Sequence, residues 1–195
     1  MRHSVYFLLF SFFVASSYSE ENDIKKSQWH GFERQDFSYD GLKCILVIPA
    51  SPAKGSPWVW RARFFGHQPQ ADIELLKKGF HIAYCDVAGL FGNEVAVDRW
   101  DRFYSMLIEE RGLSKKPALE GMSRGGLIIY NWASKNPKKV SCIYGDAPVC
   151  DIRSWPGGKG NGKGGGGTWK SALKAHGITD EESVRAKVSP IHKLK

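Results

Sequence analysis

Ser123 lies in a stretch whose residue types and spacing are typical of nucleophilic catalysis. Gly121, Ser123 and Gly125 form the pattern G-x-S-x-G within PALEGMSRGGLIIY, residues 117–130. A serine hydroxyl is a poor nucleophile at its own pKa, so it needs a neighbouring base and a tight, exposed turn. Glycines two residues to either side let a strand and a helix approach each other at such a turn. The pattern therefore predicts a nucleophilic serine, whose base and acid must be sought elsewhere in the chain.

The residues on both sides of Ser123 predict a strand that leads into a helix. Residues 117–121 form a short strand-like run, and residues 124–135 have helical spacing that stops before Pro137. In such a corner the backbone N–H of Arg124 points at an oxyanion that develops near the helix N-terminus. The alternative is a glycine-rich turn between strand and helix that happens to hold a serine.

Strand and helix patterns alternate along the rest of the chain. Strand-like runs cover residues 29–39, 42–48, 58–60, 80–86 and 140–144, and helical patterns cover residues 71–78, 100–111 and 168–176. Asp40-Gly41 is a hairpin signal. Alternation of this kind predicts an α/β fold with a mostly parallel sheet flanked by helices. Residues 155–167, WPGGKGNGKGGGG, hold eight glycines and predict a flexible excursion from the domain.

Composition and the N-terminus indicate an exported, globular, single-domain protein. The chain has 195 residues, 42% of them hydrophobic and 25% charged. Residues 1–19 combine an early Arg2, an apolar run too short for the ~20 residues that span a bilayer, and small residues before residue 20. We therefore expect a signal peptide rather than a membrane anchor, and a secreted or periplasmic protein. Residues 20–28 are polar and predicted to be disordered, and residues 29–195 form the domain.

Charge and cysteine usage exclude several classes of partner. The net charge of +8 falls to +7 without Arg2 of the signal peptide, and the basic residues are dispersed in pairs at the ends of elements. This dispersal and the predicted export argue against a nucleic-acid partner, and against a membrane partner after signal cleavage. No C-x-x-C pair or Cys/His cluster occurs, so we expect no metal, and no cofactor is implied.

Between residues 29 and 148 the chain resembles the α/β-hydrolase family. Hairpin strands, the strand at 58–60, a helix, the piece GFHIAYCDVAG at 79–89, another helix and the G-x-S-x-G turn follow in the family's order. The resemblance implies a serine hydrolase that forms an acyl-enzyme on Ser123. It also implies a second oxyanion donor after the strand at 58–60, the N–H of Arg61 or Ala62. In this family the acid usually follows the seventh strand and the histidine the eighth.

The resemblance leaves open which residues serve as the acid and the histidine that assist Ser123. Residues 140–144 would be the sixth strand, so both partners would lie beyond Lys195 and the chain would be an incomplete version of the fold. If the chain is whole, Asp146 is the acid candidate, with Asp151 second, and His192 or His176 supplies the base. A third account is a hydrolase-fold binding module without activity.

The expected substrate is a small molecule or carbohydrate ester, or an amide. Trp60 and Arg63 lie next to the predicted oxyanion loop. An aromatic ring there could stack on a sugar, and an arginine could bind a carboxylate. We therefore predict that these two residues contact substrate, although burial of the aromatic side chains in the core is the alternative.

Overall fold

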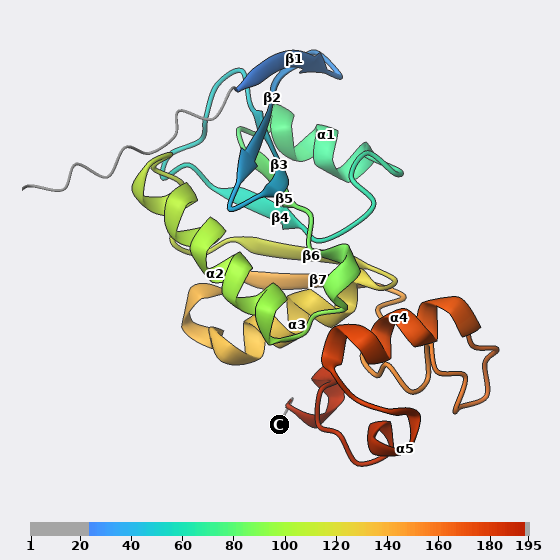
Figure 1. The fold of residues 1–195 in the computed structure, drawn as a ribbon. Coiled ribbons are helices and arrows are strands. Elements are labelled where there is room, and N and C mark those ends of the chain that lie inside the picture. Colours follow the sequence, from blue (N-terminus) through green and yellow to red (C-terminus); the bar gives the residue numbers. More distant parts are fainter. Residues whose placement is uncertain (1–23, 194–195) are drawn as a thin grey trace, which may run out of the picture.

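A computed structural model describes residues 24–193, which form a seven-stranded sheet with helices on both faces (Figure 1). The sheet order is β1-β2-β3-β5-β4-β6-β7. The strands are β1 Lys25–Trp29, β2 Phe32–Tyr39, β3 Leu42–Ile48, β4 Trp58–Arg61, β5 His81–Cys85, β6 Ala118–Met122 and β7 Cys142–Asp146. The signal peptide predicted for residues 1–19 lies outside the described residues.

The sheet is mixed, and its parallel half holds the predicted nucleophile. The pairs β1–β2, β2–β3 and β3–β5 are antiparallel. The pairs β4–β5, β4–β6 and β6–β7 are parallel. This arrangement confirms the predicted α/β class. The helices are α1 Gln70–Lys77, α2 Glu94–Glu109, α3 Gly125–Lys135, α4 Gly166–His176 and α5 Asp180–Ser183, with 3-10 turns η1 Ala88–Leu90, η2 Pro137–Lys139 and η3 Pro190–His192.

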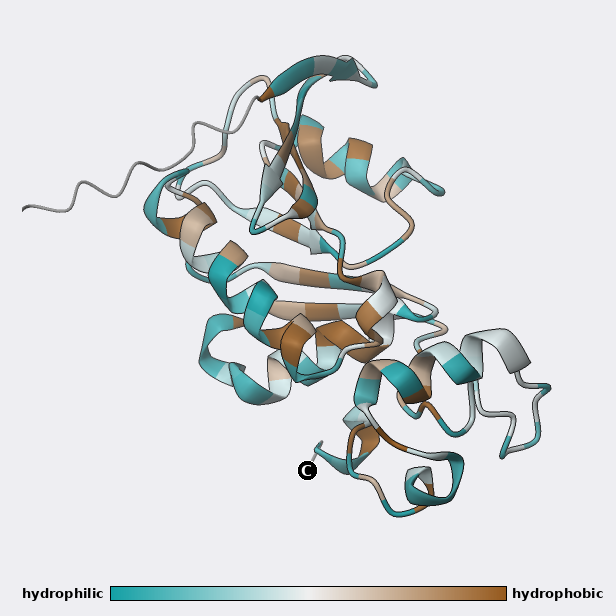
Figure 2. Cartoon of the chain, in the orientation of Figure 1, coloured by the Kyte–Doolittle hydropathy of each residue, from teal (hydrophilic) through white to brown (hydrophobic). Residues whose placement is uncertain are grey.

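The sheet separates two apolar cores. On one face, Leu76 of α1 packs against Val59 and Ile82 of the central strands. On the other face, the side chains of α2 and α3 surround Trp60, whose ring stacks on that of Trp100 with centroids 3.9 Å apart. Figure 2 shows the hydrophobic colour gathered along the strands and on α3, whereas β1 is mostly hydrophilic. Within residues 24–193 no helix is long and apolar enough to cross a membrane.

Strand β1 corrects the prediction of disorder for residues 25–28, whereas residues 20–23 of that predicted segment lie outside the described residues. Residues 25–28 belong to β1, and Lys25 pairs with Asp36 of β2 while Trp29 pairs with Phe32. The turn between these strands uses positive φ at His30 and Gly31, 51° and 85°. The β1 side chains are mostly exposed, so its pairing rests on backbone hydrogen bonds, which an apolar sequence pattern does not reveal.

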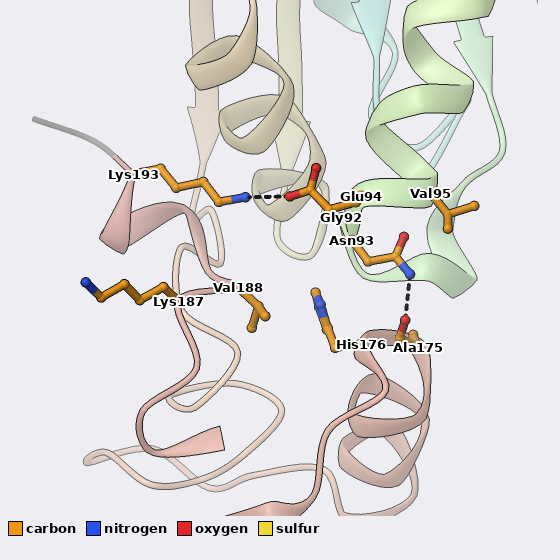
Figure 3. Close-up of a pocket in the computed structure, with 9 residues that line it drawn as sticks. All are labelled: Gly92, Asn93, Glu94, Val95, Ala175, His176, Lys187, Val188 and Lys193. Atoms are coloured by element: carbon orange, nitrogen blue, oxygen red, sulfur yellow. Dashed lines mark hydrogen bonds and ion pairs between the residues drawn. The ribbon is translucent and has the colours of Figure 1, made fainter. Parts of the chain in front are cut away.

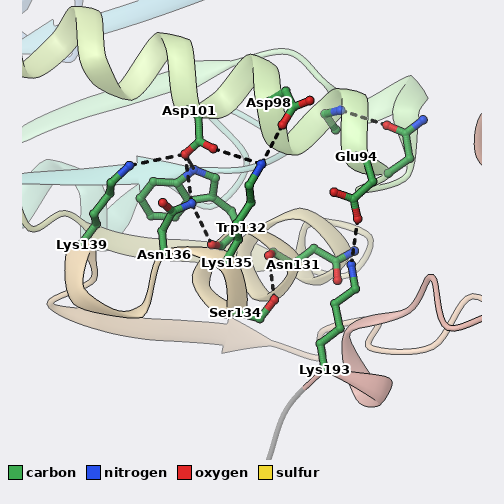
Figure 4. A network of polar contacts seen from close by, with 12 residues as sticks. Glu94, Asp98, Asp101, Asn131, Trp132, Ser134, Lys135, Asn136, Lys139 and Lys193 are labelled. Atoms are coloured by element: carbon green, nitrogen blue, oxygen red, sulfur yellow. Dashed lines mark hydrogen bonds and ion pairs between the residues drawn. The ribbon is translucent and has the colours of Figure 1, made fainter.

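Helices α2 and α3 are joined by a polar network centred on Asp101 of α2 (Figure 4). The Trp132 indole N–H and the Asn136 amide of the α3 end donate to the Asp101 carboxylate at 2.9 and 3.0 Å. Lys135 forms an ion pair with Asp98 at 2.7 Å and a longer one with Asp101 at 3.5 Å. The network keeps α3, and therefore the turn that precedes it, in a fixed position over the sheet.

The C-terminal part of the described chain forms a small lobe of turns and helices beside α3 (Figure 1). The glycine-rich excursion ends at Gly165 rather than at residue 167, because Gly166 and Gly167 begin α4. Ala172 of α4 packs against Phe91 and Leu127, which ties the lobe to the sheet domain. Thr179 and Glu182 form a capping box at α5.

Candidate active site

Ser123 occupies the turn between β6 and α3 in a left-handed backbone conformation. Its φ is 50°, a region that side chains other than glycine rarely adopt. Its N–H donates to the Asp146 carbonyl at 2.9 Å, and its carbonyl accepts from the N–H groups of Gly126 and Val149 at 3.0 and 2.8 Å. These bonds hold the strained turn in place. The half-buried Ser123 hydroxyl forms no hydrogen bond with any described residue.

Two glycines permit the close packing around this turn. A Cβ on Gly121 would collide with the Ile129 side chain and would lie 3.0 Å from the Gly125 carbonyl carbon. A Cβ on Gly126 would lie 2.7 Å from both the Pro148 Cβ and the Val149 carbonyl oxygen. The tight contact after the serine is therefore made at Gly126, one residue beyond the G-x-S-x-G pattern.

The backbone amides near Ser123 correct the predicted second oxyanion donor. The Ala62 N–H already donates to the Glu120 carbonyl at 2.9 Å. Arg61 lies inside β4, paired with Tyr84 on one side and Glu120 on the other. Arg63 is the first residue after these, and its nitrogen would lie 3.9 Å from a Cβ on Gly125. The amides of Arg124 and Arg63, rather than Arg61, therefore flank the turn.

Trp60 lies inside the protein, which corrects its predicted contact with substrate, and the Arg61 side chain is buried as well. Trp60 is fully buried between sheet and helices, so it cannot stack on a substrate. Its neighbour Arg61 points to the opposite face, where its side chain forms a buried ion pair with Asp72 and a second, at 3.3 Å, with Glu120. Because successive residues of a strand face opposite sides of the sheet, adjacent residues within β4 serve both cores and neither reaches the surface.

The structure brings Asp146 to the turn but does not bring His192 there. Asp146 pairs with Met122 across β6 and β7, and its carbonyl oxygen accepts from the Ser123 N–H. Nε2 of His192 lies 3.1 Å from Nη2 of Arg153, which also forms an ion pair with Asp151. Among residues 24–193, neither Asp146 nor His192 forms a hydrogen bond to the other or to the Ser123 hydroxyl. The pairing of Asp146 with His192 as acid and base is therefore not assembled.

His176, the other histidine considered as base, has a separate role at the end of α4 (Figure 3). Its Nε2 lies 3.2 Å from the Phe91 carbonyl oxygen, and burial lowers its pKa. It lines a cavity of about 290 Å³ together with Asn93 and Lys193. Asn93 donates to the Ala175 carbonyl at 2.6 Å, which links the start of α2 to α4. The pocket residues drawn in Figure 3 do not include Ser123.

Comparisons with known proteins find similar folds among solved structures only. No protein-family model matches the sequence, and no curated protein sequence matches it. Among solved structures, a puromycin-hydrolysing peptidase of Mycobacterium tuberculosis has a TM-score of 0.59 at 12% identity, over 88% of this chain and 29% of that chain. Candida antarctica lipase A has a TM-score of 0.56 at 11% identity, over 83% and 49%. A cold-adapted esterase from an Arctic intertidal metagenomic library has a TM-score of 0.51 at 16% identity, over 64% and 62%.

The chain has an α/β-hydrolase fold. It spans less than two thirds of the length of each of these three hydrolase structures. Within the hydrolase fold, Ser123 is at the strand-to-helix turn that follows β6, where the sequence pattern predicted it. The strand after it is the seventh here rather than the sixth, because β1 adds a strand that the sequence did not predict.

A buried polar cluster on β6, the strand that leads to the Ser123 turn, was missed by sequence reasoning. Glu120 lies two residues before Met122, the last residue of β6, and Arg61 lies between Glu120 and Asp72. Burial, and then the charge of Asp72, raise the pKa of Glu120 to about 7. Burial likewise raises the pKa of Asp72. The available signal for this cluster was a charged residue, Glu120, between buried neighbours in a strand. Its partners Arg61 and Asp72 come from β4 and α1, so the sequence could not identify them.

Proposed function

We propose that this protein is a serine hydrolase that cleaves an ester or amide bond through an acyl-enzyme on Ser123. The observation that carries the proposal is the φ of 50° at Ser123, held by main-chain hydrogen bonds between β6 and α3. A strained serine at such a strand-to-helix turn is the arrangement of nucleophiles on this fold. The hydrolase fold shared with an esterase, a lipase and a peptidase supports the reaction class, and we propose a small-molecule or carbohydrate ester as substrate.

In the proposed reaction the Ser123 oxygen attacks the carbonyl carbon and gives its proton to a base. The negative charge that develops on the carbonyl oxygen accepts hydrogen bonds from the N–H groups of Arg124 and Arg63. Collapse of the tetrahedral intermediate expels the alcohol or amine, which takes up the proton. Water then hydrolyses the acyl-enzyme by the same steps in reverse order, and the Ser123 hydroxyl is restored.

The base is the part of the proposal that the described residues do not supply. No histidine among residues 24–193 forms a hydrogen bond with the Ser123 hydroxyl, and Nε2 of His192 lies 3.1 Å from Arg153. The proposed reaction therefore takes its base from a histidine outside these residues, or from His192 after it leaves Arg153. Added imidazole can replace a missing base, because a small molecule can reach a half-buried serine.

Hydrolysis of 4-nitrophenyl butyrate, with and without imidazole, tests the proposal. We expect the protein to hydrolyse the ester, and added imidazole to accelerate this hydrolysis by a larger factor than it accelerates the reaction without protein. The activity should be lost in Ser123→Ala. The matched control is Ser171→Ala, which removes an exposed hydroxyl on α4. Turnover unaffected by Ser123→Ala would contradict the proposal.

A binding module without activity is the second function, favoured by the absence of a hydrogen bond to the Ser123 hydroxyl among the described residues. On this account the protein would bind an ester without cleaving it. A folded protein that binds the ester but gives no turnover at any imidazole concentration would favour the binding module.

A further inference from the structure

Two arginine side chains flank the Ser123 turn without an acidic partner. Arg124 follows Ser123 directly, and a Cβ on Gly125 would lie 3.6 Å from the Arg63 Cβ. Among residues 24–193, neither side chain has a carboxylate within ion-pair distance. Four other arginines form ion pairs with carboxylates, Arg34, Arg61, Arg102 and Arg153, whereas Arg99, Arg111 and Arg185 form none among the described residues. The turn therefore has two positive charges that no described side chain compensates.

Aromatic rings hold the Arg124 guanidinium in position. Its Cζ lies 5.4 Å from the ring centroid of Phe91 and 5.5 Å from that of Trp155. Contacts with ring faces leave the N–H groups at the guanidinium edge free to donate. Trp155 comes from the glycine-rich excursion, so this segment reaches back to the turn. A guanidinium held in this way loses less conformational entropy when a ligand binds.

Arg63 has a buried donor that lacks an acceptor. Its Nε is inaccessible to solvent and has no hydrogen-bond partner, while its Cζ lies 4.5 Å from the ring centroid of Phe64. A buried donor without an acceptor is costly, and Trp60, Trp100 and Arg61 each hold one as well. Burial and the nearby charge of Arg63 lower the pKa of Arg124. An anion between the two side chains would relieve the charge repulsion.

We propose that Arg63 and Arg124 bind a carboxylate, so that the substrate at the Ser123 turn is an ester bearing a carboxylate group. The planar guanidinium fork matches the two oxygens of a carboxylate. The position of the pair beside Ser123 places such a group next to the bond to be cleaved. The role in substrate choice rests on the proposed hydrolase function, but binding of the carboxylate does not require the reaction.

Titration with succinate, followed by NMR chemical shifts or calorimetry, tests the carboxylate site directly. We expect wild-type protein and Ser123→Ala to bind succinate with the same affinity, and the neutral analogue succinamide at least about tenfold more weakly. Arg63→Gln and Arg124→Gln should each weaken succinate binding by roughly tenfold, the loss expected for one charge-assisted hydrogen bond. Arg102→Gln, which removes an arginine paired with Asp40, is the matched control and should leave succinate binding unchanged.

Three outcomes overturn the carboxylate proposal: no binding of succinate to the wild-type protein, equal binding by wild type and both glutamine variants, or tighter arginine-dependent binding of sulfate than of succinate. Arg124→Lys keeps the positive charge, and a thermal melt of each variant excludes loss of fold as the cause. If succinate binds as expected but neither 4-nitrophenyl butyrate nor mono-4-nitrophenyl succinate is hydrolysed, the proposed hydrolase fails while the carboxylate site stands.

Discussion

The cluster of Arg61, Asp72 and Glu120 combines one positive charge with two carboxyl groups in a buried place. One arginine can compensate one carboxylate, so the second carboxyl group is favoured in its neutral, protonated form. Burial and the charge of Asp72 raise the pKa of Glu120 to about 7. The proton on this pair therefore links the stability of the fold below the Ser123 turn to pH.

Glu120→Gln should remove part of the pH dependence of stability. The pKa of Glu120 is higher in the folded protein, about 7, than its ordinary value of 4.5. The folded protein keeps this proton while the unfolded chain loses it, so the contribution is complete below pH 4.5 and is lost as pH rises toward 7. The free energy of unfolding of the wild type, measured with urea, should fall from pH 5 to pH 8 by at least about 1 kcal/mol more than that of the variant. This amount corresponds to roughly one pKa unit.

Glu109→Gln is the matched control, because Glu109 is exposed near the end of α2. It should change the difference between the two pH values by less than the Glu120 substitution does. An unchanged pH dependence in Glu120→Gln would show that Glu120 carries no shared proton.

Individual site residues were predictable where the signal was local. Gly121, Ser123 and the turn they form follow from five consecutive residues. Trp60 was misplaced because the sequence does not say which face of a strand a core covers, and Arg61 because β4 extends through residue 61 and pairs there on both sides. His192 contacts Arg153 from 39 positions away, and no local pattern encodes such a contact.

At the scale of elements, α3 begins against the chain that follows β7, and Gly126 permits this contact. Gly126→Ala should destabilise the protein by about 1–3 kcal/mol, because its Cβ would lie 2.7 Å from both Pro148 and the Val149 carbonyl oxygen. Gly125→Ala is the matched control, since a Cβ there would approach nothing closer than the Ala62 Cβ at 3.4 Å. Denaturant unfolding compares the two. A larger loss in Gly125→Ala would mean that the glycine of the sequence motif makes the tighter contact.

The polar network between α2 and α3 predicts unequal effects for two aspartates. Asp101→Ala leaves the buried Trp132 indole N–H without its acceptor and should cost about 1–3 kcal/mol of unfolding free energy. Asp98→Ala removes an exposed ion pair with Lys135 and should cost less than about 1 kcal/mol. Thermal and urea unfolding measure both. Equal losses of unfolding free energy in the two variants would contradict the prediction that the hydrogen bond from Trp132 to Asp101 contributes most to the network.

Most elements were predictable because their apolar spacing differs between helix and strand. The hairpin turn at Asp40-Gly41 was predictable from its residue types, and both residues have positive φ, 53° and 70°. Strand β1 was not predictable, since its residues are polar and its stability comes from backbone pairing with β2. The helix α2 was predicted to begin at residue 100 but begins at Glu94, where Asn93 caps it by accepting from the Ala96 N–H.

At the scale of the whole molecule, the described sheet ends at β7 with apolar side chains in solvent. Ile143 is 37% exposed and Tyr144 is 63% exposed. An uncovered edge strand with apolar side chains promotes pairing with other chains. We expect this 195-residue chain to associate as its concentration rises.

Ile143→Lys should reduce this association, measured by sedimentation velocity over a range of concentrations. Val184→Lys is the matched control, because it replaces an apolar residue that is 57% exposed on the C-terminal lobe. A wild-type protein that stays monomeric at high concentration and melts cooperatively would contradict the expectation.

Labelling with a fluorophosphonate probe, located by peptide mass spectrometry, tests the central proposal that Ser123 is a nucleophile. We expect a covalent adduct on the peptide that contains Ser123, formed faster with imidazole present, absent after denaturation and absent in Ser123→Ala. A folded protein that acquires no adduct at Ser123, with or without imidazole, would contradict it.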